Sequence, residues 1–532
     1  MNFAAVILKN WKKIVLVFFI VILSTTLIHS NLKIFFSQKK QSKIELNYKV
    51  NYNSMPINLN IWESEMYYAA IPVQQMIGNL VYYSNFGRYE LRLAKSWKRL
   101  ADNLWVVDLK SGASCENGEK ITAESFVKSI SRSLFIMSSN GGTPVLKNLI
   151  GYEKFVRDNQ GKSIFNLDPI QGLRFNNDQI IFEFDKPIRD GVLQILSFAP
   201  YGYICSENLN SDGSWKDSRK IISSGAYRLK EYINSNYIVL EKNSSWIEKY
   251  GHGSPDIVHY IQGIDTKKVV INDDSILATI ADSFTELSSV DDLIKYAVVQ
   301  EYFKGIVLGN FETGVFSNLK NRRLFRKKFL EFKNEIVATH PEVKFTNSIY
   351  PSQDLEFKDN DVDGVDSIAL NGKKINIMGN EPKIGTRNWL PWSILKKTLD
   401  YFGVPYQFSK SSYSRDDLTD NRYDLRLVGP SVGGGVEAWV IDVMFCSKFN
   451  ASFPDPTGKI CNLINEYNQN KLADKQLAKL FLEAVDEDSL ILPFSQFGVQ
   501  LYLSKNINLQ SVSPMISVIR FDQIEINDEK VF

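Results

Sequence analysis

Residues capable of nucleophilic, acid–base or metal chemistry are few and widely spaced in this chain. The sequence contains four histidines and four cysteines: His29, His252, His259, His340, Cys115, Cys205, Cys446 and Cys461. It has no CxxC pair, HExxH motif, Walker A loop, GxGxxG fingerprint or GxSxG elbow, so the spacing offers no zinc site, phosphate loop or activated serine. A hydrolase built on Asp455 and nearby acids is the enzymatic alternative, and no spacing favours it. We therefore expect no enzyme, no cofactor and no metal site.

The cysteines leave two interpretations open. Free cysteine is among the most buried residue types, and this habit favours four independent buried thiols. Cys446 and Cys461 lie 15 positions apart and could instead close a small loop through one disulfide. Four buried thiols is the preferred interpretation.

The composition indicates a globular protein without a nucleic-acid partner. The 532 residues are 44% hydrophobic and 23% charged, which is ordinary for a chain of two to four domains and excludes global disorder or a multi-span membrane protein. Lysine and arginine number 62 and aspartate and glutamate 60, so the formal net charge is only +2. No global basic field is present. The basic run at 319–336 fits a solvated helix face better than a nucleic-acid patch.

The N-terminal segment has the features of an export signal. Lys9, Lys12 and Lys13 precede an uncharged stretch at 14–32 whose first half reads IVLVFFIVIL. Basic residues before such a run mark a signal peptide or signal anchor, and the stretch is close to the length that spans a bilayer. Its end at 26–30 is a poor cleavage site and lacks a lipid-accepting cysteine. We therefore favour an uncleaved anchor over a cleaved signal.

Short strands and helices are mixed along the rest of the chain. Apolar periodicity and turn residues predict strands at 104–109 and 237–240, a hairpin at 173–184, and helices at 122–134, 319–336 and 472–485. This mixture, without regular βα alternation, predicts an α/β body of interleaved lobes. Thr122 is the expected N-cap of its helix, but Ser125 at N3 leaves the capping box incomplete. The acidic stretch 353–372 fits a loop better than a calcium site, because the EF-hand spacing is absent.

An ordered series of short motifs resembles one known family. The series is Leu93–Trp97 (LAKSW), Asp102–Trp105 (DNLW), Leu109–Gly112 (LKSG) and Glu116–Glu124 (ENGEKITAE). Its order and spacing are similar to a block of the family 5 extracellular solute-binding proteins, the peptide-, dipeptide- and nickel-binding receptors of ABC importers. Weaker matches follow at 224–232, 237–243 and 491–494. The motifs consist of packing residues such as Trp97 and Trp105 and turn glycines such as Gly112, so they specify fold rather than ligand.

The resemblance implies a periplasmic-binding-protein-like α/β fold with two lobes, interleaved chain crossings, an extra subdomain and a ligand cleft between the lobes. Such folds close on ligand by a hinge. The implied division is 1–32 signal anchor or signal peptide, 33–44 linker, 45–262 lobe I with a subdomain inserted at about 79–160, 263–496 lobe II, and 497–532 return to lobe I.

The family pattern also implies a ligand site with two walls. Counting back from Asn79-Leu80, the first wall is Glu65, Met66 and Tyr67, where members present extended backbone to the ligand. Tyr423-Asp424-Leu425 looks like the strand that leads into the cleft. The second wall should follow it and comprises Gly429, Pro430, Ser431, Gly433 and Gly434, with Trp439 just beyond. A cleft lined by backbone can bind an extended peptide as an added strand, and glycines allow a ligand backbone to approach closely.

The second wall departs from the peptide-binding members. Those members carry a Gly-Trp and an Asp that pairs with the peptide's amino terminus. Here Pro430 replaces the tryptophan, and no aspartate stands at the expected place, although Glu437 is near. The glycine run fits either a surface that a ligand approaches or a flexible turn, and Trp439 fits either stacking on the ligand or core packing. We expect loose specificity or a ligand without a free amine.

The resemblance implies an extracytoplasmic receptor that delivers a peptide or similar small solute to an ABC importer, with the importer's permease as its protein partner. It implies a periplasmic or cell-surface location, anchored to the inner membrane through residues 14–32. The alternative function is a membrane-anchored relative that acts as a sensor or surface scaffold without a transport role.

The anchor gives a first testable prediction. The run at 14–32 should hold the protein at a membrane, with residues 45–532 outside the cytoplasm, because an apolar stretch of this length prefers the bilayer. Fractionation combined with protease access in spheroplasts measures this. Full-length protein found in the cytoplasmic fraction would contradict it, and an exported protein that starts near Asn31 would indicate cleavage rather than anchoring.

Overall fold

The computed structural model divides the chain at Ile44 into Met1–Ile44 and a body, Glu45–Phe532. The described residues are 43–50, 58–62, 67–83, 89–139, 145–189, 191–233, 237–262, 276–280, 293–311, 313–337, 339, 367–368, 373–384, 389–410, 422–428, 438–446, 453, 455–512 and 519–527. Within these ranges, no helix has both the length and the apolar character needed to cross a bilayer. The expected anchor at 14–32 and nearly all of the acidic stretch 353–372 lie outside them.

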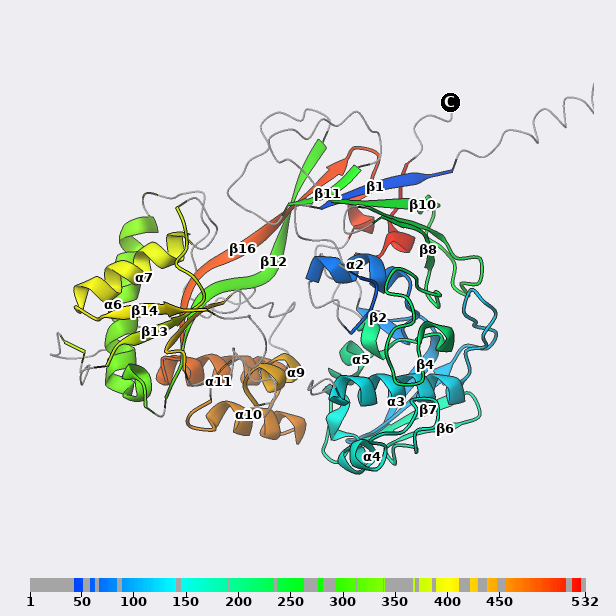
Figure 1. The fold of residues 1–532 in the computed structure, drawn as a ribbon, viewed down its shortest axis with the longest axis horizontal. Coiled ribbons are helices and arrows are strands. Elements are labelled where there is room, and N and C mark those ends of the chain that lie inside the picture. The colour runs from blue at the N-terminus through cyan, green and yellow to red at the C-terminus, as the bar shows by residue number, and fades with distance from the viewer. Residues whose placement is uncertain are drawn as a thin grey trace, which may run out of the picture. The chain divides into compact units, whose positions relative to one another are not determined.

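Ten strands of the body form one sheet, in the order β14-β13-β15-β12-β16-β11-β1-β10-β9-β8 (Figure 1). The strands are β1 (Glu45–Val50), β8 (Tyr227–Ile233), β9 (Tyr237–Lys242), β10 (Ile257–Gln262), β11 (Ile276–Ile280), β12 (Leu293–Leu308), β13 (Ile375–Met378), β14 (Tyr406–Ser409), β15 (Leu425–Val428) and β16 (Ile491–Ser504). β1 pairs in parallel with both β10 and β11, and the β8–β9 hairpin closes one edge. The strand predicted at 237–240 is confirmed as β9, and the non-sequential strand order requires the interleaved crossings expected from the sequence.

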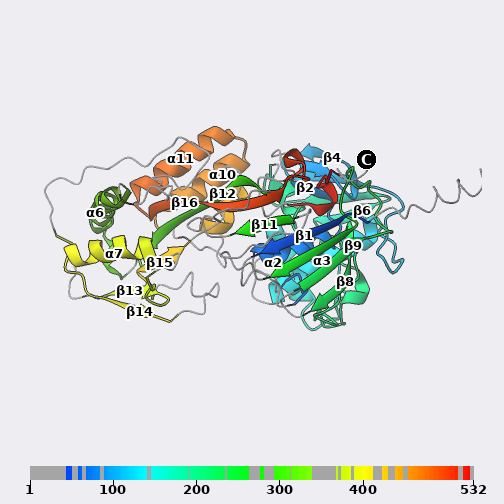
Figure 2. The same ribbon diagram turned by 90° about the horizontal axis from the view of Figure 1, so that it is seen from above.

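Two long strands, β12 and β16, connect the two halves of this sheet. They pair antiparallel along most of their length, and both views show them side by side, β12 in green and β16 in red (Figures 1 and 2). The pairing shifts register at 298–302 and again at 304–305, and such irregularities bend a strand. β15 lies next to β12 and β11 next to β16, so the ladder from one half of the sheet to the other passes through this pair.

A second sheet of four antiparallel strands has the order β4-β5-β7-β6. Its strands are β4 (Ala94–Ala101), β5 (Leu104–Leu109), β6 (Leu173–Asn176) and β7 (Gln179–Glu183), and helix α3 (Ala123–Ser139) packs against β6 and β7. The predicted strand at 104–109, the hairpin at 173–184 and the helix beginning near 122 are confirmed. Asn177 turns the hairpin with φ of 52°, a left-handed conformation that asparagine tolerates. Trp105 is buried as expected of a packing residue, whereas Trp97 is only half-buried.

The N-terminus of α3 is capped more completely than the sequence predicts. The Ser125 backbone N–H donates to Thr122 Oγ1 at 3.1 Å, as expected for an N-cap threonine. The Thr122 backbone N–H in turn donates to Ser125 Oγ at 2.8 Å. The expectation of an incomplete capping box is wrong, because the serine hydroxyl makes the reciprocal bond that a glutamate or glutamine usually makes.

Four helices pack beside β12–β16 and form two apolar clusters. They are α6 (Leu319–Val337), α7 (Trp389–Tyr401), α10 (Lys459–Asn468) and α11 (Asp474–Glu487). Phe325, Phe329 and Trp392 belong to the cluster under α6 and α7, and Leu477 and Phe481 to the cluster under α10 and α11. The helices predicted at 319–336 and 472–485 are confirmed as α6 and α11.

Part of the basic face of α6 is buried rather than solvated, which corrects the expectation from sequence. Arg322 and Arg326 are 5% and 4% exposed. Three guanidiniums donate to the last carbonyl oxygens around the end of α11: Arg322 to Asp488 at 2.7 Å, Arg323 to Glu487 at 2.9 Å and Arg326 to Asp486 at 3.1 Å. Arg326 also pairs with the Asp486 carboxylate. A helix C-terminus carries partial negative charge and unpaired carbonyls, so these arginines stabilise the end of α11.

The four cysteines form two disulfides, so the preferred interpretation of four buried thiols is wrong. Cys115, in the turn between β5 and α3, bonds to Cys205 with a Cα–Cα separation of 6.3 Å. Cys446 bonds to Cys461 in α10 with a Cα–Cα separation of 5.4 Å. Both separations suit a disulfide. The 15-residue loop was recognisable from the sequence, but the first pair is 90 residues apart and depends on the tertiary fold.

The C-terminal segment is tied into the first half of the body by buried charges. Arg92 Nη2 lies 2.6 Å from Asp522 Oδ2, with side-chain exposures of 6% and 1%. Burial opposes ionisation of Asp522, but the positive charges of Arg92 and Arg520 outweigh it and lower the pKa of Asp522 on balance. Burial also lowers the pKa of Arg520 to about 10. Phe521 extends the connection, because its backbone N–H donates to Gln75 Oε1 at 3.2 Å.

This buried pair predicts a site-specific stability loss. Asp522→Asn leaves Arg92 buried without its anion and should lower the free energy of unfolding by about 3–5 kcal/mol. Asp400→Asn is the matched control, because Asp400 pairs with Lys396 on the surface and should change the free energy by no more than about 0.5 kcal/mol. Urea unfolding followed by tryptophan fluorescence measures both. Equal effects of the two substitutions would contradict the prediction.

The pH dependence follows from the lowered pKa. Asp522 stabilises the folded state above its unfolded pKa of about 3.9, and this stabilisation is lost as the pH falls through the lower folded pKa. The difference between wild type and Asp522→Asn should therefore be largest near neutral pH and shrink below about pH 4.

Candidate functional site

The sequence-predicted site residues lie mostly beyond the described ranges. Glu65, Met66, Gly429, Pro430, Ser431, Gly433 and Gly434 fall outside them. Tyr67 is the first residue of helix α2 (Tyr67–Gln75), and Trp439 lies within α9 (Ala438–Ile441). The two-walled cleft therefore stays a prediction, and the site geometry comes from the described residues alone.

The segment after Tyr67 is held by close backbone packing. Ile71 and Val73 of α2 are buried, and Gln75 Nε2 donates to the Ile519 carbonyl at 2.9 Å. The end of α2 lies directly on Gly225, where a Cβ atom would stand 2.5 Å from the Gln75 carbonyl oxygen. The Ser224-Gly225 motif therefore has a packing role, as expected, because only glycine permits this approach.

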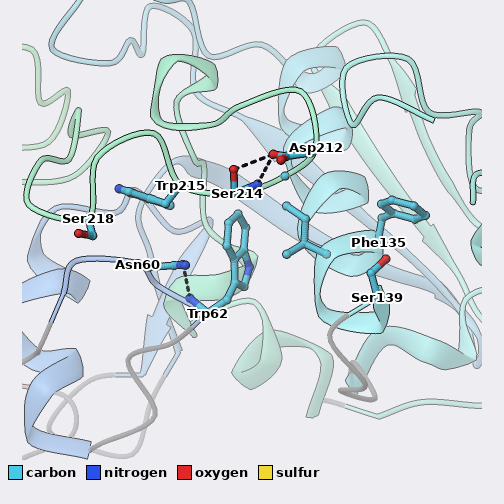
Figure 3. Close-up of a pocket in the computed structure, with 10 residues that line it drawn as sticks. Asn60, Trp62, Phe135, Ser139, Asp212, Ser214, Trp215 and Ser218 are labelled. Atoms are coloured by element: carbon cyan, nitrogen blue, oxygen red, sulfur yellow. Dashed lines mark hydrogen bonds between the residues drawn. The ribbon is translucent and has the colours of Figure 1, made fainter. Parts of the chain in front are cut away.

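A pocket of about 390 Å³ lies in the first half of the body (Figure 3). Three parts of the chain line it: Asn60 and Trp62 before α2, the last turn of α3, and the loop at 212–218. The lining residues are Asn60, Trp62, Phe135, Ile136, Ser139, Asp212, Gly213, Ser214, Trp215 and Ser218. Trp62 stands only three residues before Glu65 in the sequence, which is the first residue for which ligand contact is predicted.

Hydrogen bonds fix the two tryptophans that line the pocket. The Leu59 backbone N–H donates to the Ser218 carbonyl at 2.8 Å and joins the two segments. The Trp62 backbone N–H donates to Asn60 Oδ1 at 3.1 Å, and Trp215 Nε1 donates to the Lys220 carbonyl at 2.9 Å. The two indoles meet edge to face, with centroids 5.9 Å apart and planes at 76°. Within the described part of the chain, Trp62 Nε1 has no hydrogen-bond partner.

Asp212 carries the charge in this pocket. Its Oδ1 accepts from the Ser214 hydroxyl at 2.7 Å and from the Ser214 backbone N–H at 2.9 Å. These bonds hold the pKa of Asp212 below its ordinary value, so the side chain is a carboxylate at neutral and mildly acidic pH. With two indoles, a phenyl ring, hydroxyls and one anion, the pocket can bind a small group but offers no nucleophile–base pair.

Two contacts link residues that precede β12 with residues that follow β15. Arg189 Nη1 donates to the Leu472 carbonyl at 3.0 Å, and its guanidinium lies 4.5 Å from the ring centroid of Tyr467. Burial raises the pKa of Asp442, which follows α9, and the positive charges of Lys147 and Lys186 offset part of that rise. These interactions connect the first half to α10 and to the segment that follows α9.

The acid considered for hydrolysis has a structural role. Asp455 Oδ2 accepts from the Cys461 backbone N–H at 2.9 Å, in the first turn of α10, where an anion suits the free N–H groups of a helix N-terminus. Within the described ranges, no three His, Cys, Asp or Glu side chains gather in a way that could hold a metal ion.

No sequence pattern predicted the pocket. Two features of the sequence belong to this pocket: the Asp212–Trp215 run (DGSW), which suits a turn, and Trp62, just before the predicted first wall. Neither could reveal that residues 150 positions apart share one pocket, because that proximity depends on the Leu59–Ser218 backbone bond.

Comparison with known families supports the resemblance drawn from the motifs. Residues 88–282 match the model described as bacterial extracellular solute-binding proteins, family 5, middle region. The family resemblance is thereby confirmed over that range, which contains the LAKSW-to-TAE block and the Ser224–Tyr232 motif. No curated protein sequence matches the chain.

Solved structures confirm the expected fold. OppA of Burkholderia pseudomallei aligns with a TM-score of 0.68 at 15% identity, covering 91% of this chain and 99% of its own. Haemophilus influenzae OppA, solved in complex with RPPGFSPFR, gives 0.68 at 14% identity and covers 91% and 99%. Brucella suis NikA, solved in complex with Fe(III)-EDTA, gives 0.65 at 16% identity and covers 91% and 100%. The body therefore has the periplasmic-binding-protein-like α/β fold.

Proposed function

We propose that this chain is an extracytoplasmic solute-binding receptor that delivers a peptide or similar small solute to an ABC importer. The observation that carries the proposal is the match of residues 88–282 to the family 5 solute-binding model, within a body whose fold aligns over its near-entire length with OppA. The OppA of Haemophilus influenzae holds a nonapeptide in its structure, which makes a peptide the first ligand class to test.

The disulfides support a location outside the cytoplasm. The four cysteines of the sequence all form disulfides, and paired cysteines persist in oxidising compartments such as the periplasm or cell surface. The same proposal includes membrane attachment through residues 14–32 and contact with a permease. It also includes domain boundaries at 262 and 496. The proposed ligand-binding residues are Glu65, Met66, Tyr67, Gly429, Pro430, Ser431, Gly433, Gly434 and Trp439.

Hinge closure is the mechanism that this topology suits. The β12–β16 pair joins the halves of the large sheet, and its register shifts at 298–302 and 304–305 are positions where bending needs little rearrangement of the ladder. A ligand that contacts both halves would favour the closed state by its differential affinity. No step in this mechanism requires a bond to be made or broken. No observation favours the sensor or scaffold alternative.

The cleft walls can be tested by substitution. Gly434→Phe should abolish binding of peptides found in a calorimetric screen, because a bulky side chain would occupy the space where a ligand backbone approaches. Tyr67→Ala should weaken binding, and neither change should shift the unliganded Tm appreciably. If ligand affinity survives both substitutions together, the placement of the cleft is wrong.

The Arg189 contact gives a test of closure. Arg189→Ala removes the bond to Leu472 and the contact with Tyr467, so the closed state should lose stability and ligand affinity should fall about tenfold. Arg157→Ala is the control, because the Arg157 side chain is 70% exposed. Titration calorimetry with the same peptide measures both, and equal affinities for the two variants would contradict a role in closure.

A further inference from the structure

We propose that the pocket between Trp62 and Trp215 holds a positively charged group of the ligand, an ammonium or a guanidinium. The inference rests on the proposed receptor function and names the ligand chemistry at a site that the family motifs do not mark. It is carried by the charge and the aromatic surface of this pocket.

The charge of the pocket is negative. Asp212 is the charged side chain among the residues that line it. Both bonds from Ser214 end on Oδ1, which leaves the second carboxylate oxygen available to a ligand. Among the described residues, the ion pairs nearest to Asp212 in the sequence are Lys162–Asp168 and Lys220–Asp217, and neither includes Asp212. A carboxylate without a counter-ion beside a concave surface favours a cation.

Basic residues of the same loop do not neutralise this carboxylate. Lys216, Arg219 and Lys220 are exposed and do not line the pocket. The Lys220 ammonium lies 3.5 Å from Asp217, and the Arg219 backbone N–H also bonds to Asp217. Asp217 is therefore the acid with which this part of the loop interacts, whereas Asp212 is an exposed residue at the lining of the pocket.

The aromatic surface suits the same ligand group. Tryptophan is the aromatic side chain that attracts cations most strongly through its ring face. The edge-to-face arrangement of Trp62 and Trp215 presents one indole face beside the edge of the other, and Phe135 adds a third ring (Figure 3). Rings combined with one carboxylate are the chemistry that recognises ammonium and guanidinium groups.

The pocket contains an acid of the kind that the predicted second wall lacks. The second predicted wall lacks the aspartate with which peptide-binding relatives hold an amino terminus, and the expectation was loose specificity or a ligand without a free amine. Asp212 supplies a carboxylate in a pocket formed by described residues. A cationic ligand is therefore compatible with this chain, although the acid comes from a different part of the sequence.

Matched peptides separate the two sources of positive charge. Acetyl-Ala-Lys-Ala-amide against acetyl-Ala-Met-Ala-amide tests a side-chain ammonium, and Ala-Ala-Ala-amide against its acetylated form tests the α-ammonium. Titration calorimetry with the full exported protein should show about tenfold tighter binding of the charged member of at least one pair. Raising the salt concentration should reduce the preference.

Two substitutions locate the effect. Asp212→Asn keeps the amide oxygen that can accept from Ser214, and it should bring the two members of the pair within about twofold of each other. Asp217→Asn removes a neighbouring carboxylate that does not line the pocket, and it should leave the preference intact. Trp62→Leu should weaken the charged peptide more than the neutral one. Circular dichroism melting confirms that each variant is folded.

The outcomes distinguish this inference from the receptor function. Peptides that bind equally whether charged or neutral, or a preference that survives Asp212→Asn, would overturn the inference and leave the receptor function standing. If no peptide binds, peptide delivery is wrong, and arginine amide then tests the pocket directly. Arginine amide that fails to bind at millimolar concentration, or binds equally well to Asp212→Asn, overturns the inference.

Discussion

The pairing of β12 with β16 is the constraint on which the rest of the body depends. These strands are separated by about 190 residues in the sequence, yet they form the ladder that joins the halves of the ten-stranded sheet. The segments between them fold back onto the same ladder as β13, β14 and β15. The chain passes between the halves along β12 and β16. Each half can therefore pack around its own core, and this strand pair joins the two halves of the sheet.

In each half, buried polar contacts join segments that are far apart in the sequence. In the first half, Arg92 and Asp522 tie the C-terminal segment to the strands near the N-terminus. In the second half, arginines of α6 hold the end of α11. These groups have little freedom to move, since a buried charge that loses its partner is costly. The pocket at Trp62 and Trp215 instead lies among surface loops, where side chains remain available to a ligand.

Local sequence patterns predicted many helices and strands correctly. They missed features that depend on contacts between segments far apart in the sequence. Strand, turn and helix patterns depend on residues close together in the sequence. The sequence therefore predicted the strand at 104–109, the turn at Asn177 and the helix at 472–485. The family motifs then predicted the fold correctly, since they consist of packing and turn residues. The basic face of α6 was misjudged because nothing in its own sequence shows the free carbonyls of α11 opposite it. The Cys115–Cys205 disulfide and the Asp212 pocket were missed for the same reason. The predicted cleft residues stay a prediction.

The central claim is that ligand binding closes the two halves over an unreacted solute. Small-angle X-ray scattering of the full exported protein, titrated with a pool of free and blocked tripeptides, tests it most directly, with mass spectrometry of the recovered peptide. The account predicts that the radius of gyration falls to a plateau and that the bound peptide is recovered intact. Peptide that binds without compaction, or that is recovered cleaved, would contradict it.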